Sequence, residues 1–91
     1  MMLNFEEKEM NGGVQRLFVF DNGYGASVIK HKGSYGFSEG LWELAVIIWS
    51  DDVQSYNLDY STPITDDVIG YLAESEVDSI LKQIMELPSK K

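Results

Sequence analysis

Few side chains in this sequence are of the types that carry out acid–base, metal or nucleophilic chemistry. The single histidine, His31, lies between Lys30 and Lys32. Two adjacent positive charges repel both a proton and a metal ion, so this position suits neither acid–base catalysis nor metal binding. The chain has no cysteine, which excludes disulfides and thiolate metal sites. We therefore expect no catalytic or metal-binding role for His31.

Two pairs of neighbouring acids, Asp51 with Asp52 and Asp66 with Asp67, could bind a hard cation or transfer protons. Adjacent side chains on a strand point to opposite faces, and acids at a helix start interact favourably with the helix dipole. Both pairs therefore have a structural explanation. The G-x-x-x-x-G-K-[ST] phosphate loop is absent, and no serine has an identifiable base partner. We predict that the protein is not an enzyme and uses no cofactor or metal.

The chain has 91 residues, 44% of them hydrophobic, which fits one domain with one core. We assign residues 1–13 to an N-terminal arm or short helical turn, 14–87 to a single domain and 88–91 to a tail. The longest apolar run, Leu44–Trp49, has six residues, whereas a membrane span needs roughly 20. No secretory signal pattern is found near the N-terminus. We expect a cytoplasmic protein that does not contact a membrane.

The elements that must position any site begin with a hairpin. Gln15–Phe20 alternates like a strand, and Asn22-Gly23 is the dipeptide typical of a two-residue type I′ turn. A second strand then starts at Tyr24. With a two-residue turn, Val19 lies opposite Ala26.

The most hydrophobic segment, Leu41–Trp49, predicts a central strand covered on both faces. Trp42 and Trp49 are seven residues apart, so they face opposite sides of the sheet. Alternating residues from Ser55 to Tyr60 predict a strand with one apolar face.

The last third of the domain predicts helix. Thr65 before Asp66 and Asp67 resembles an N-cap, and Val77–Leu87 follows the helical i, i+3, i+4, i+7 pattern. Ser75 could cap this second helix, or one kinked helix could run from 66 to 87. The predicted fold is α+β: a four-stranded antiparallel sheet followed by one or two C-terminal helices packed on one face.

The charge is strongly negative and uneven. The formal net charge is −8, and the stretch from Glu39 to Leu81 contains ten acids and no lysine or arginine. Such a surface repels phosphates, which disfavours direct DNA or RNA binding and favours a basic protein partner. The alternative is that the acids only keep a small domain soluble. Within the glycine-spaced loop 32–40, Tyr35 and Phe37 could be contact anchors or could fold back onto the sheet.

Four blocks of the sequence together resemble a family of small bacteriophage-encoded proteins of unassigned function. These blocks are Asn22–Val28 (NGYGASV), Ser34–Gly36 (SYG), Leu41–Val46 (LWELAV) and Thr62–Leu72 (TPITDDVIGYL). The resemblance covers residues 13–87. It implies an accessory protein in the cytoplasm of a bacterial host, where small acidic proteins often disable a host factor.

We therefore predict a non-enzymatic protein that binds a bacterial host protein with a basic surface, such as a nucleic-acid-handling or defence factor. The alternatives are a structural protein that forms a homo-oligomer and, third, a small-ligand or nucleotide-binding enzyme. The predicted partner-binding residues are the two loop aromatics and four acids: Tyr35, Phe37, Asp66, Asp67, Glu74 and Glu76.

Overall fold

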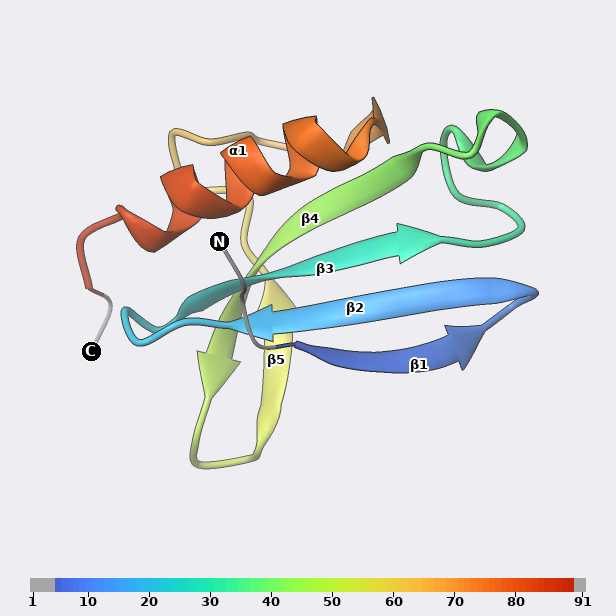
Figure 1. Ribbon diagram of the computed structural model, residues 1–91. Coiled ribbons are helices and arrows are strands. Elements are labelled where there is room, and N and C mark those ends of the chain that lie inside the picture. Colours follow the sequence, from blue (N-terminus) through green and yellow to red (C-terminus); the bar gives the residue numbers. More distant parts are fainter. Residues whose placement is uncertain (1–4, 90–91) are drawn as a thin grey trace.

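The computed structural model describes residues 5–89, which form one curled antiparallel sheet with a helix on one face (Figure 1). The strand order is β1-β2-β3-β4-β5, and β6 pairs with β4. The elements are β1 (Glu6–Met10), β2 (Gly13–Val19), β3 (Tyr24–Lys30), a short 3-10 turn η1 (Phe37–Glu39), β4 (Trp42–Ser50), β5 (Ser55–Leu58), β6 (Ile69–Leu72) and α1 (Glu74–Met85). The predicted α+β class is confirmed, with six strands in place of four and one helix.

Strand β4 is the centre of the sheet, as its uninterrupted apolar run predicts. β3 pairs along one edge of β4, from Glu43 to Ile48. The other edge is shared, because β5 pairs with residues 47–50 and β6 pairs at Trp42 and Leu44. Helix α1 packs over β3, β4 and β6. The core between helix and sheet contains Phe18, Tyr24, Ala26, Val28, Trp42, Leu44, Val46, Leu72, Val77, Leu81 and Ile84.

The prediction of an N-terminal arm or short helical turn is wrong for residues 6–10, which form the edge strand β1. The turn that joins it to β2 is Asn11-Gly12, and both residues have positive φ, 45° and 79°. This is the backbone that an Asn-Gly hairpin requires. The charges of Glu6–Glu9 do not prevent a strand, because an edge strand is exposed to water.

The predicted register of the β2–β3 hairpin is wrong by one residue. The loop has three residues, Asp21–Gly23, and Phe18 lies opposite Ala26 where Val19 was expected. The Gly23 N–H donates to the Phe20 carbonyl at 3.0 Å, and Gly23 has φ 90°. A type I turn followed by a left-handed glycine accounts for the extra loop residue. The shift places Phe18 in the core and leaves Val19 41% exposed.

The helix predicted to start after Thr65 is also wrong. Thr65 Oγ1 accepts the Asp67 N–H at 3.1 Å and donates to the Asp67 carbonyl at 2.8 Å, which closes a local turn in place of a cap. The residues that follow become strand β6 on the open edge of β4. The single helix begins after Ala73, whose N–H donates to Glu76 Oε1 at 2.9 Å, so Ser75 is not the cap.

One side chain of the hairpin loop holds the end of α1. Asn22 Nδ2 lies 2.9 Å from the Ile84 carbonyl oxygen, 3.1 Å from that of Leu87 and 3.3 Å from that of Met85. Asn22 Oδ1 also accepts the Tyr24 N–H at 3.0 Å. The last carbonyls of a helix lack partners within it, so one amide satisfies both the loop and the helix end.

Replacing Asn22 with alanine should lower the free energy of unfolding by about 2 kcal/mol, because several carbonyls at the helix end lose their donor. Asn22→Asp retains an acceptor for the Tyr24 N–H but puts a negative charge at the helix C-terminus, and should destabilise at least as much. Urea denaturation measures the free energy of unfolding of both variants. Asn57→Ala, at an exposed position, is the control and should unfold with a free energy within roughly 0.5 kcal/mol of wild type. We call the contacts of Asn22 with the end of α1 the Asn22 clamp. An Asn22→Asp variant as stable as wild type would show that this clamp contributes nothing to stability.

Candidate functional site

The loop that carries Tyr35 is interlocked with strand β6 through two glycines. A Cβ on Gly70 would lie 2.6 Å from the Cβ of Tyr35, and a Cβ on Gly36 would lie 3.1 Å from the Cα of Tyr71. The contact at Gly70 is too short for a side chain unless something shifts, and the contact at Gly36 would require its neighbour to move slightly. Gly36 also has φ 90°, which favours glycine. The loop and β6 therefore lie in close contact at these two glycines.

Strand β6 contains a β-bulge at this contact. Trp42 pairs with Leu72 and Leu44 pairs with Ile69, so two residues, Gly70 and Tyr71, lie opposite Glu43 alone. Tyr71 adopts φ 57°, in the left-handed region that costs an aromatic residue about 1 kcal/mol. The surrounding packing thus holds a tyrosine in a backbone conformation that its side chain disfavours.

The bulge and the loop present two tyrosines side by side to solvent. Tyr35 is 59% exposed and Tyr71 is 56% exposed. Their ring centroids are 6.4 Å apart, with an interplanar angle of 31°. The backbone N–H of Tyr35 donates to Glu43 Oε1 at 2.9 Å, which fixes the loop to β4. We call Tyr35 and Tyr71 the tyrosine pair.

Sequence reasoning named Tyr35 but missed Tyr71. In a helix within residues 66–87, as the apolar spacing predicts, Tyr71 has no special place. The signal that could have found it is Gly70, because a glycine inside an apolar run can mark a bulge or a close backbone approach. Phe37, predicted as the second anchor, lies in η1 and is only partly exposed.

The four predicted acids are exposed, and three of them also make hydrogen bonds or an ion pair within the fold. Asp66 and Asp67 lie in the loop before β6, where Asp67 Oδ1 accepts the Val68 N–H at 2.7 Å. Glu74 lies 3.4 Å from Arg16, and Glu76 accepts the N–H at the helix start. These acids therefore contribute charge to the surface while three of them also support the fold.

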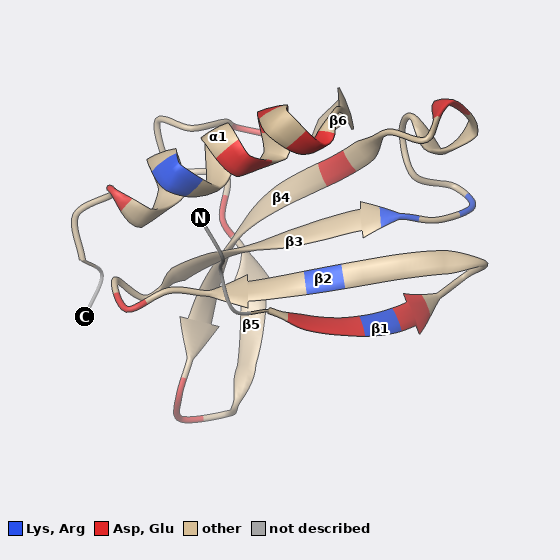
Figure 2. Ribbon diagram, in the orientation of Figure 1, with Lys and Arg blue, Asp and Glu red and all other residues tan. Residues whose placement is uncertain are grey.

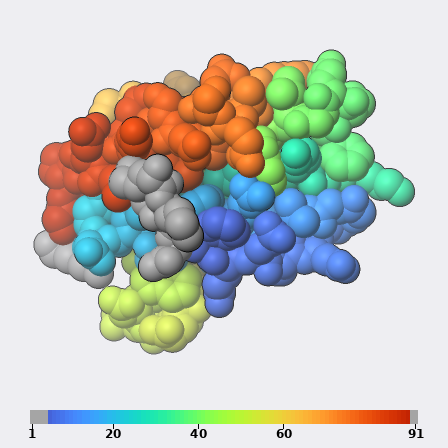
Figure 3. All heavy atoms as spheres, viewed as in Figure 1, coloured from blue at the N-terminus to red at the C-terminus, as the bar shows by residue number. Residues whose placement is uncertain are grey.

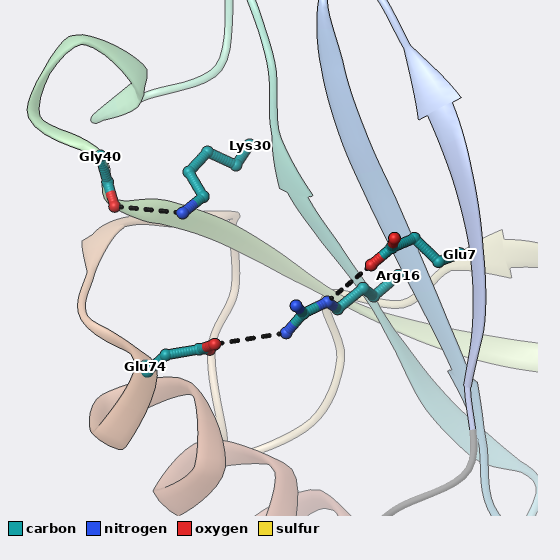
Figure 4. Close-up of polar contacts among 5 residues, drawn as sticks. All are labelled: Glu7, Arg16, Lys30, Gly40 and Glu74. Carbon is teal, nitrogen blue, oxygen red and sulfur yellow. Dashed lines mark hydrogen bonds and ion pairs between the residues drawn. The ribbon is translucent and has the colours of Figure 1, made fainter.

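Arg16 links three elements of the fold (Figure 4). Its guanidinium lies 3.1 Å from Glu7 of β1 and 3.4 Å from Glu74 of α1, and it stacks over Trp42 at 4.6 Å from the ring centroid. Lys30 Nζ also lies over Trp42, at 4.3 Å, and donates to the Gly40 carbonyl at 3.4 Å. Two basic side chains thus cover a buried tryptophan.

Figure 2 shows acidic residues along β1 and α1 and in the turns. The negative charge therefore extends to the N-terminal strand and is not confined to residues 39–81. His31 Nδ1 lies 2.7 Å from the Lys32 carbonyl oxygen. Within residues 5–89, no group of three histidine, aspartate or glutamate side chains is placed to hold a metal ion. No helix in that range is long and apolar enough to span a membrane.

Comparisons of the chain with protein families, curated proteins and solved structures found no match. The resemblance to a bacteriophage family stays a prediction. Any functional assignment therefore depends on the chain's own geometry, in which the tyrosine pair is the most distinctive exposed feature.

The backbone at Tyr71 can be tested by substitution. Asparagine tolerates a positive φ and a β-branched residue does not, so Tyr71→Asn should keep wild-type stability within roughly 0.5 kcal/mol while Tyr71→Val loses about 1 to 2 kcal/mol. Urea denaturation gives both values. Tyr60 is 38% exposed and is not among the positive-φ residues, so Tyr60→Asn and Tyr60→Val are matched controls without this difference. Equal stability of the two Tyr71 variants would contradict a strained bulge.

Proposed function

We propose that this chain is a non-enzymatic protein-binding domain whose contact surface is centred on the tyrosine pair. The observation that carries the proposal is the display of two tyrosines, each more than half exposed, on a loop and a strand locked together by Gly36 and Gly70. Tyrosines are enriched among the residues that contribute most to protein–protein affinity. Holding the two tyrosines in a rigid frame should raise the affinity further, because little side-chain and loop entropy is then lost on binding.

The chemistry of the partner follows from charge. The net charge is −8, and Arg16 and Lys30 are occupied by contacts within the fold. A partner with a basic surface would associate faster than a neutral one through long-range attraction. Nucleic acid is itself negatively charged and would be repelled by an acidic domain. We therefore propose a basic protein as the partner, and not DNA or RNA.

The biological setting is supported by the four sequence blocks that resemble bacteriophage proteins. In that setting the partner is a bacterial host protein in the cytoplasm, and binding disables it. A nucleic-acid-handling enzyme or a defence factor has the basic surface that such an acidic domain would fit.

A homo-oligomer is the second candidate, and exposed apolar side chains on the β4–β5 hairpin favour it. Leu58 of β5 is 51% exposed and Val53 in the preceding turn is 70% exposed. Pairing through the opposite edge is disfavoured, because β1 carries four charges in five residues. Size-exclusion chromatography with light scattering separates the candidates, since a strict monomer at tens of micromolar removes this one.

The protein-binding proposal predicts a selective loss of binding. We expect Tyr35→Ser combined with Tyr71→Asn to weaken binding to a partner captured from bacterial lysate roughly tenfold or more. Isothermal titration with the purified partner measures the change. The matched control is Tyr60→Ser, a tyrosine outside the pair, which should retain wild-type affinity.

Two outcomes would contradict the proposal. One is a partner that binds the double variant as tightly as wild type while the variant melts at the wild-type temperature. The other is an affinity unaffected by raising salt from about 0.05 to about 0.5 M, because an acidic domain that recognises a basic face must lose affinity with screening.

A further inference from the structure

Strand β1 leaves one edge of the sheet open. It is the first strand in the order β1-β2-β3-β4-β5, and within residues 5–89 no strand pairs with its outer edge. In the space-filling view β1 (dark blue) lies along the lower border of the molecule (Figure 3). The residues from Glu6 to Glu9 are all exposed. A free edge presents backbone donors and acceptors that can pair with another strand.

The two-residue turn between β1 and β2 determines which backbone groups face outward. Met10 and Gly13 flank this turn and lie opposite each other. Residues in that position form a hydrogen-bonded pair, and such pairs alternate with non-hydrogen-bonded ones along the ladder. Lys8 therefore directs its backbone N–H and C=O toward β2, as Met10 does. Glu7 and Glu9 direct theirs away from the sheet.

The two residues with outward-facing backbone groups are both acidic. Glu7 and Glu9 are two positions apart on a strand, so their side chains lie on the same face. Glu7 lies 3.1 Å from Arg16, whereas Glu9 forms no ion pair within the described part of the chain. Opposite charges on directly opposed strand residues stabilise the pair. A strand with basic residues at both opposed positions therefore fits this edge.

The same charges disfavour a second copy of the chain at this edge. In an antiparallel pair of β1 strands centred on Lys8, the two lysines would lie opposite each other and Glu7 would lie opposite Glu9. Like charges that are directly opposed destabilise a sheet. The edge therefore distinguishes a basic strand from another acidic one.

We propose that the outer edge of β1 accepts an extended basic segment of a partner protein as an added antiparallel strand, with lysine or arginine opposite Glu7 and Glu9. The added strand exchanges backbone hydrogen bonds with these two residues. The residues between the basic ones are uncharged, because Glu6 and Lys8 on the other face of β1 carry opposite charges. This edge is separate from the tyrosine pair and needs no contribution from it.

The first test uses the capped peptide Lys-Val-Lys-Val-Lys, titrated into the full chain and followed by NMR. At a peptide concentration of roughly four times the Kd, exchange of the Glu7 and Glu9 amide protons with water should slow about fivefold. The Lys8 and Met10 amides, which already bond to β2, should keep their rates. Absence of binding would overturn the proposal, and so would slower exchange at Lys8 in place of its two neighbours.

A second peptide separates strand pairing from simple charge attraction. It has the same sequence with a methyl group on the backbone nitrogen of each lysine, so it keeps the charge and loses those donors. It should bind roughly tenfold more weakly, because two backbone hydrogen bonds are lost. Equal affinities of the two peptides would show that only charge attracts them, and would overturn an added strand.

A pair of charge reversals locates the contact. Glu9→Lys should weaken binding of the unmethylated peptide roughly fivefold, because a like charge then opposes its lysine. Glu86→Lys, at the exposed C-terminal end of α1, changes the net charge equally and should keep the affinity within about twofold. Equal losses in the two variants would contradict a site on β1.

The remaining measurements separate this edge from other surfaces. The double variant Tyr35→Ser with Tyr71→Asn should bind the peptide like wild type, so failure of the β1 edge is distinguishable from failure of the protein-binding proposal. Without peptide, exchange at Glu7 and Glu9 should not depend on protein concentration. Slower exchange at higher protein concentration would show that a second copy occupies the edge, and would overturn the proposal.

Discussion

The constraint on which the rest of the structure depends is that two strands share one edge of β4. β5 occupies residues 47–50 of that edge and β6 occupies residues 42–44. Between them, the Asp59 N–H donates to the Val46 carbonyl at 2.8 Å. Because β5 must leave the edge before β6 can join it, the sheet curls. The irregular entry of β6 onto this edge produces the bulge that presents Tyr71.

The helix is held on this curled sheet at both ends by contacts of very different strength. At its start, the ion pair between Arg16 and Glu74 is largely exposed, with 63% of the Glu74 side chain accessible, so it contributes little to stability. At its end, Asn22 supplies a donor to several carbonyls at once. The buried contacts of Val77, Leu81 and Ile84 set the helix face, while Asn22 fixes where the helix stops.

The sequence predicts whatever depends on periodicity. The α+β class, the central position of β4 and the helix through Val77, Leu81 and Ile84 follow from apolar spacing. It does not predict what depends on distant contacts. Asn22 in the hairpin loop bonds a helix end more than sixty positions away, and β6 pairs with the part of the β4 edge that β5 leaves open. The sequence does not predict Tyr71 because its strand forms only through pairing with β4. It does predict Tyr35, because the glycine-spaced loop is visible in the sequence alone.

The surface of this domain is more acidic than its composition indicates, because part of its positive charge is used in packing. Arg16 and Lys30 lie over the ring of Trp42, which is only 3% exposed. Their attraction to the ring and to nearby oxygens keeps them close to the body of the protein, and the carboxylates of α1 and β1 stay at the periphery. Self-repulsion among those carboxylates lowers stability at low salt, so the core and the Asn22 clamp must offset it. A basic partner of the kind we propose would relieve the same repulsion on binding, and would thereby couple the net charge of −8 to recognition.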